Sequence, residues 1–63
     1  MTLAAETKKM QEIIRRCMRK GYKVFLCKSK NGYSFDAFDG QGVKYCRSLF
    51  HVVLEVETLE EKS

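Results

Sequence analysis

The stretch YKVFLCKSKNGYSFDAFDGQGVKYCR, from Tyr22 to Arg47, decides the fold because it divides into three short apolar segments separated by two glycine-containing turns. Aromatic and β-branched residues dominate residues 22–28, and this composition is typical of a β-strand. Asn31 and Gly32 then predict a hairpin turn of type I′, because both residue types tolerate the positive φ angles that this turn requires. Residues 33–39 are therefore expected to form a second, antiparallel strand.

Alternation along the strands predicts which face of the sheet is buried. Tyr33, Phe35 and Ala37 share one face of the second strand and make that face apolar. A turn at residues 39–42 leads into a third strand, residues 43–47, which alternates again. In this interpretation the buried face also carries Val43 and Tyr45, and the exposed face carries Lys23, Phe25, Cys27, Ser34, Asp36, Phe38, Lys44 and Cys46.

Helical patterns flank the predicted sheet. Apolar residues recur in residues 2–20 at spacings of three, four and seven, and Gly21 follows, where a left-handed residue commonly ends a helix. The segment 48–61 is ambiguous, since part of it alternates as a strand would, but Ser48 is a good N-cap. Its apolar residues also fall within one arc of a helical wheel, and they are Leu49, Val52, Val53, Val56 and Leu59.

These patterns together predict a single small α+β domain covering residues 1–63. The predicted order is α-β-β-β-α, with a three-stranded antiparallel meander and two helices packed on one face of it. The alternative is a fourth strand in place of the second helix.

Length and residue content restrict the class of function. A chain of 63 residues with no evident catalytic constellation is expected to be non-enzymatic, with no cofactor and no small-molecule substrate. No apolar run approaches the roughly 20 residues that cross a bilayer, and the N-terminus lacks the pattern of a signal peptide. We therefore expect a cytoplasmic protein with no membrane partner.

The three cysteines, Cys17, Cys27 and Cys46, are expected to be reduced and packed as small hydrophobic residues. Together with His51 they could supply four zinc ligands. None of them has the close Cys-x-x-Cys spacing that marks zinc sites, so we predict no metal site.

Charge is unevenly distributed in a chain whose net charge is +4. Residues 1–47 are strongly basic and residues 48–63 are acidic, which suits steered encounter with a complementary macromolecule or head-to-tail self-association. The densest basic set is a candidate contact for nucleic acid or for an acidic partner, and it consists of Arg15, Arg16, Arg19, Lys20, Lys23, Lys28 and Lys30.

Four apolar residues fall outside the predicted core. Phe25 and Phe38 lie on the exposed face of the predicted sheet, and Phe50 and Leu54 lie on a flank of the second helix. We interpret the four as a protein-contact surface and predict a protein-binding module that regulates or inhibits a macromolecular partner, or that self-associates. Cover of Phe50 and Leu54 by the first helix is the alternative. The competing functional hypothesis is a nucleic-acid-binding domain that uses the basic residues at the end of the first helix and along the first strand.

The predicted order α-β-β-β-α is similar to that of double-stranded RNA-binding domains, and a three-stranded sheet backed by a C-terminal helix resembles DNA-binding modules that lay strands in the major groove. This resemblance implies nucleic-acid binding. It is a resemblance of element order, since the second helix begins Ser48-Leu49-Phe50-His51, where the RNA-binding domains carry a lysine cluster.

Overall fold

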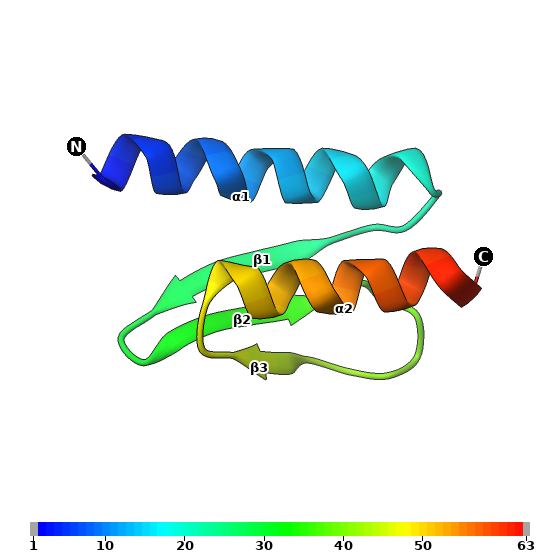
Figure 1. Cartoon of the computed structure of the whole chain (residues 1–63). Helices are drawn as coiled ribbons and strands as arrows, with labels where there is room; N and C mark the ends of the chain where they lie inside the picture. The colour runs from blue at the N-terminus through cyan, green and yellow to red at the C-terminus, as the bar shows by residue number, and fades with distance from the viewer. Residues whose placement is uncertain (1, 63) are drawn as a thin grey trace.

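A computed structural model describes residues 2–62 of the chain (Figure 1). It contains two helices and a three-stranded antiparallel sheet, which confirms the predicted order and the α+β class. The C-terminal segment is a helix, so the alternative of a fourth strand is wrong. No helix among the described residues is long and apolar enough to cross a membrane. The elements are α1 (Thr2–Arg19), β1 (Phe25–Ser29), β2 (Gly32–Asp36), β3 (Lys44–Cys46) and α2 (Leu49–Lys62).

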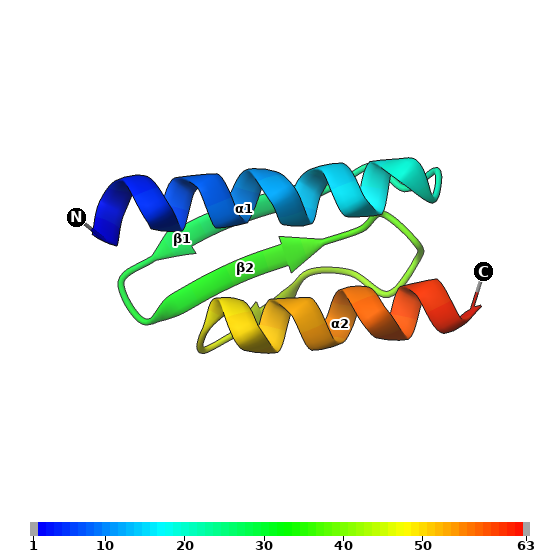
Figure 2. The ribbon, with the colours of Figure 1, turned by 45° about the horizontal axis from the view of Figure 1, so that its top comes forward.

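The sheet has the order β1-β2-β3, and each strand is antiparallel to its neighbour. Both helices lie on the same face of this sheet and run in the same direction, with α1 over β1 and α2 over β2 and β3 (Figure 1, Figure 2). The predicted packing of two helices on one face is confirmed.

The core lies between the sheet and the two helices. Phe35, Val52 and Val56 are almost completely buried, so the middle of β2 packs directly against α2. The apolar face predicted for the second strand and the apolar arc predicted for the second helix are both confirmed. The buried residues are Ile13, Cys17, Tyr33, Phe35, Ala37, Cys46, Val52, Val56 and Leu59.

The end of α1 explains why β1 begins later than predicted. The Tyr22 amide donates to the Cys17 carbonyl at 3.2 Å, and the Gly21 amide donates to the Met18 carbonyl at 3.0 Å. With Gly21 at φ 91°, these bonds form a Schellman motif that closes the helix. Tyr22 is thereby part of the helix cap, and pairing with β2 begins only at Phe25.

The hairpin between β1 and β2 is confirmed, but its predicted type I′ geometry is wrong. Ser29 pairs with Gly32, so the turn residues are Lys30 and Asn31, and the only non-glycine residue with positive φ among residues 2–62 is Phe38. A Cβ atom on Gly32 would lie 2.2 Å from the Cys46 carbonyl oxygen. Glycine is therefore needed here for the close approach of β3 rather than for the turn.

β2 ends at Asp36, three residues before the predicted end of the second strand. The Asp36 carboxylate accepts a hydrogen bond of 2.8 Å from the Phe38 amide, and Phe38 has φ 54°, which turns the chain out of the sheet. Asp39 accepts a similar bond from the Gln41 amide at 3.2 Å in the following loop.

β3 presents the opposite faces from those predicted. Cys46 pairs with Tyr33 and is buried, and Lys44 pairs with Phe35 on the helix side of the sheet, where its ammonium lies 3.7 Å from a Glu55 oxygen. Tyr45 is exposed instead. The predicted placement of Val43 and Tyr45 on the buried face, with Lys44 and Cys46 on the exposed one, is therefore wrong.

Ser48 caps α2 as predicted. Its side-chain oxygen accepts a hydrogen bond of 3.2 Å from the amide of His51, three residues further along the chain, which is the usual N-cap geometry. The cap lies two residues after β3, so it sets where the helix starts over the sheet.

Candidate functional site

The face of the sheet turned away from both helices carries aromatic side chains. We call it the open sheet face and define it as Phe25, Cys27, Ser34, Asp36 and Tyr45. Phe25 pairs with Asp36, and Cys27, Ser34 and Tyr45 lie in one row across the three strands. Phe25 is 47% exposed and Tyr45 is 79% exposed. Two large aromatic residues from the outer strands therefore flank the polar residues of β2.

Two further apolar side chains are exposed near the ends of the strands. Val43 precedes β3, Phe38 follows β2, and both are exposed. Phe38 lies beside the segment 21–23 and borders a shallow hollow there. The predicted exposure of Phe25 and Phe38 is confirmed, whereas Tyr45 was missed because the faces of β3 were assigned the wrong way round.

Phe50 and Leu54 lie on a different side of the molecule. Both are on the outer surface of α2, nearly opposite the buried Val52 and Val56, and Phe50 is 72% exposed. α1 packs beside α2 but leaves both residues exposed, so the alternative that the first helix covers them is wrong. The four residues predicted as one contact surface are thus divided between two faces.

The predicted basic set is also divided, and Arg16 is already paired. The Arg16 guanidinium donates to both oxygens of Glu60, from Nε at 2.7 Å and from Nη2 at 2.9 Å, and Nη2 is 3.8 Å from a Glu57 oxygen. These hydrogen bonds lower the pKa of Glu60 and raise the pKa of Arg16. Arg16 therefore joins α1 to α2, and its predicted contact with phosphates or an acidic partner stays a prediction.

Lys28 makes a second link, between the sheet and the start of α1. Its ammonium lies 3.0 Å from a Glu6 carboxylate oxygen and 5.3 Å from the centre of the Tyr33 ring. The Tyr33 hydroxyl donates to the same Glu6 oxygen. The hydrogen bonds from Tyr33 and Lys28 lower the pKa of Glu6, and the bond to Glu6 raises the pKa of Tyr33.

The remaining basic residues are exposed but do not form one patch. Arg19 and Lys20 lie at the C-terminal end of α1, whereas Lys30 lies in the β1–β2 turn at the other end of the molecule (Figure 1). Glu6, the partner of Lys28, is 13 residues from Arg19 along α1, which corresponds to about 20 Å. The full predicted set is Arg15, Arg16, Arg19, Lys20, Lys23, Lys28 and Lys30, and it spans both ends of the fold.

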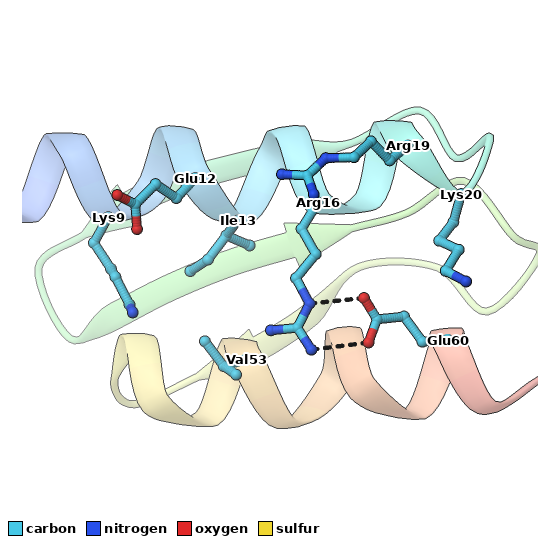
Figure 3. Close-up of a pocket in the computed structure, with 8 residues that line it drawn as sticks. All are labelled: Lys9, Glu12, Ile13, Arg16, Arg19, Lys20, Val53 and Glu60. Atoms are coloured by element: carbon cyan, nitrogen blue, oxygen red, sulfur yellow. Dashed lines mark hydrogen bonds and ion pairs between the residues drawn. The ribbon is translucent and has the colours of Figure 1, made fainter.

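A groove with a volume of about 420 Å³ lies between α1 and α2. Figure 3 shows Lys9 and Lys20 pointing from α1 toward α2 on either side of the Arg16–Glu60 pair. The sequence prediction included Lys20 but not Lys9. Spacing along α1 could have identified Lys9, since it lies seven residues before Arg16 on the same side of the helix.

The cysteines occupy two environments. Cys17 and Cys46 are buried, and burial raises the pKa of both thiols. Cys27 lies on the open sheet face, as the alternation predicted, and is exposed, so the expectation that it packs as a small hydrophobic residue is wrong. Among residues 2–62, no group of three or more His, Cys, Asp or Glu side chains is placed to hold a metal ion.

The described chain therefore offers two surfaces of different chemistry, the aromatic open sheet face and the basic groove between the helices. No protein-family model, curated protein or solved structure matches the chain significantly.

Proposed function

We propose that this chain is a non-enzymatic protein-binding module, a regulator or inhibitor that docks a partner protein on the open sheet face. The observation that carries the proposal is the exposure of Phe25 and Tyr45 on the side of the sheet that neither helix covers. Phe38 and Val43 are further exposed apolar residues, next to the ends of β2 and β3. Exposed aromatic groups of this kind gain hydrophobic free energy when a partner removes them from water.

The chemistry of the face favours protein over nucleic acid. Aromatic residues are enriched at the centres of protein interfaces, where a few anchors contribute most of the binding free energy. Asp36 pairs with Phe25 on this face, two residues along β2 from the Ser34 that pairs with Tyr45, and its carboxylate repels phosphate groups. The basic residues that would attract phosphates lie on other parts of the molecule or are paired within it.

The test is affinity capture of partners with and without nuclease, using the double variant Phe25→Ser/Tyr45→Ser. We expect this variant to lose a partner protein that the unmodified chain retains after nuclease treatment, with a cost of about 1 kcal/mol or more at each central contact. Met18→Ser is the matched control, because Met18 is 61% exposed on α1 and lies away from the open sheet face.

Two results would contradict the proposal. Equal capture by the double variant and by the control would show that the open sheet face makes no contact. Loss of all bound material on nuclease treatment would favour the nucleic-acid hypothesis instead.

A further inference from the structure

The groove between α1 and α2 combines an excess of positive charge with an apolar floor. Four basic and two acidic side chains line it, together with the apolar side chains of Ile13 and Val53. The Arg16–Glu60 pair crosses the groove and leaves Lys9 and Lys20 on either side (Figure 3). Lys9 and Lys20 are exposed, so the two ends of the groove each present a lysine ammonium to solvent.

Val53, which lines the groove, has apolar neighbours on the exposed outer surface of α2. Val53 is half-buried, and Phe50 precedes it by three residues, so the two lie in one row along the helix. Phe50 is exposed, and Leu54 lies beside it. An apolar side chain of a partner protein could cover these residues. A nucleic-acid backbone is charged and would gain nothing by covering them.

We propose that the groove between α1 and α2 binds an acidic amphipathic helix of a partner protein. Carboxylates of that helix pair with Lys9 and Lys20, and its apolar side packs on Phe50 and Val53. The Arg16–Glu60 pair stays closed beneath it. This surface is separate from the open sheet face and lies on the opposite side of the molecule, so the inference goes beyond the proposed function and does not depend on it.

Dimensions and charge fit a helix of modest length. Lys9 and Lys20 are 11 residues apart, a separation of about 16 Å along α1, so a partner helix of about three turns reaches both. Helices that lie in grooves use apolar anchors at i, i+3, i+4 and i+7, so leucines at these positions of the partner helix would share the side that meets Val53 and Phe50.

Nucleic acid fits the same groove less well. Glu12 and Glu60 line it, and Glu57 lies beside Arg16, so a continuous row of phosphates would meet carboxylates as well as cations. A helix whose carboxylates are spaced by whole turns can avoid these positions.

The experiment measures fluorescence anisotropy of a labelled peptide of about 14 residues, which forms a helix with glutamates on one side and leucines on the other. Lys9→Glu/Lys20→Glu should weaken binding by about tenfold or more, since two ion pairs become repulsions. The control is Lys8→Glu/Arg15→Glu, which changes the net charge by the same amount on the same helix but outside the groove. This control should change the affinity for the peptide by less than about twofold. Phe50→Ala should weaken binding without changing net charge.

Circular dichroism tests whether each variant is folded. If the charge reversals unfold the chain, the double variant Lys9→Gln/Lys20→Gln takes their place. Equal weakening by the two double variants would overturn the proposal, as would equal affinity for a peptide whose glutamates are replaced by glutamines. Tighter binding of an RNA duplex with the same dependence on Lys9 and Lys20 would also overturn it. None of these binding measurements depends on Phe25 or Tyr45. A negative result for the groove is therefore distinct from a negative result for the open sheet face.

Discussion

Gly32 is the residue at which the sheet is most tightly constrained. It has φ 148°, and the Cys46 carbonyl oxygen occupies the space that a Cβ atom would need. Because the obstructing atom belongs to the backbone of β3, a side chain at this position must displace a strand. Next to this contact Cys46 pairs with Tyr33, which places Tyr45 on the open sheet face.

Gly32→Ala should therefore reduce the free energy of unfolding strongly, by about 3 kcal/mol or more, through strain and displacement of β3. Urea unfolding measures this. Gly21→Ala is the control, since Gly21 also has positive φ but a Cβ atom added there would meet no other atom within 4 Å, and it should cost only about 1–2 kcal/mol. Equal effects of the two substitutions would show that the close approach at Gly32 is not a constraint.

At the scale of elements, two side-chain clusters hold α1 in place. Arg16 joins it to Glu60 and Glu57 of α2, and Glu6 joins it to Lys28 and Tyr33 of the sheet. In both clusters a carboxylate accepts hydrogen bonds, which lower the pKa of Glu60 and of Glu6. Ionised glutamates thus favour the folded state.

The sign of the resulting pH dependence follows from the lowered pKa of each carboxyl. Stabilisation by Glu6 and Glu60 is complete above the ordinary glutamate pKa of about 4.3 and is lost as pH falls through the lowered values. We expect the free energy of unfolding, measured by urea titration, to fall on acidification below this pH. Glu60→Gln should make that fall shallower, and Glu61→Gln, at an exposed neighbouring position, should not. Identical slopes for both variants would contradict the role of the Arg16–Glu60 pair.

Helices and the first hairpin could be predicted from the sequence because their signals are local. Gly21 and Ser48 mark helix ends through hydrogen bonds to residues within five positions, and alternation of Tyr33, Phe35 and Ala37 identifies the buried face of β2. The faces of β3 depend instead on the path of the loop before it, and a shift of one residue exchanges them. Local alternation in this short strand does not contain that information.

The candidate sites were predicted less completely, for the same physical reason. Exposure of Phe25 and Phe50 follows from periodicity, whereas Phe38 lies beyond the end of β2 and the exposure of Tyr45 depends on the register of β3. The pairing of Arg16 with Glu60 joins residues 44 positions apart and is determined by how α1 packs against α2. Sequence composition showed an excess of basic residues without showing which of them are paired.

At the scale of the whole molecule, the acidic and basic parts of the sequence do not form two separate poles. Glu55 is paired with Lys44, and Glu57 and Glu60 lie against Arg16, so part of the negative charge of α2 is balanced inside the molecule. The exposed chemistry is divided between two opposite sides, aromatic on the sheet and basic between the helices. If both proposals hold, the open sheet face and the groove between α1 and α2 would let the chain contact two partners, or two parts of one partner, at the same time.

The most direct measurement of contact at the open sheet face is site-specific photo-crosslinking from position 45. Replacing Tyr45 by the photoreactive residue benzoylphenylalanine keeps an aromatic ring where the structure has one, and the same replacement of Met18 places the probe on α1. If the open sheet face binds protein, illumination in lysate gives a discrete protein adduct from position 45. The protein in that adduct can be a partner or a second copy of the chain. The probe at position 18 gives no adduct of that size. Absence of an adduct from position 45, or the same adducts from both positions, would contradict protein binding at the open sheet face.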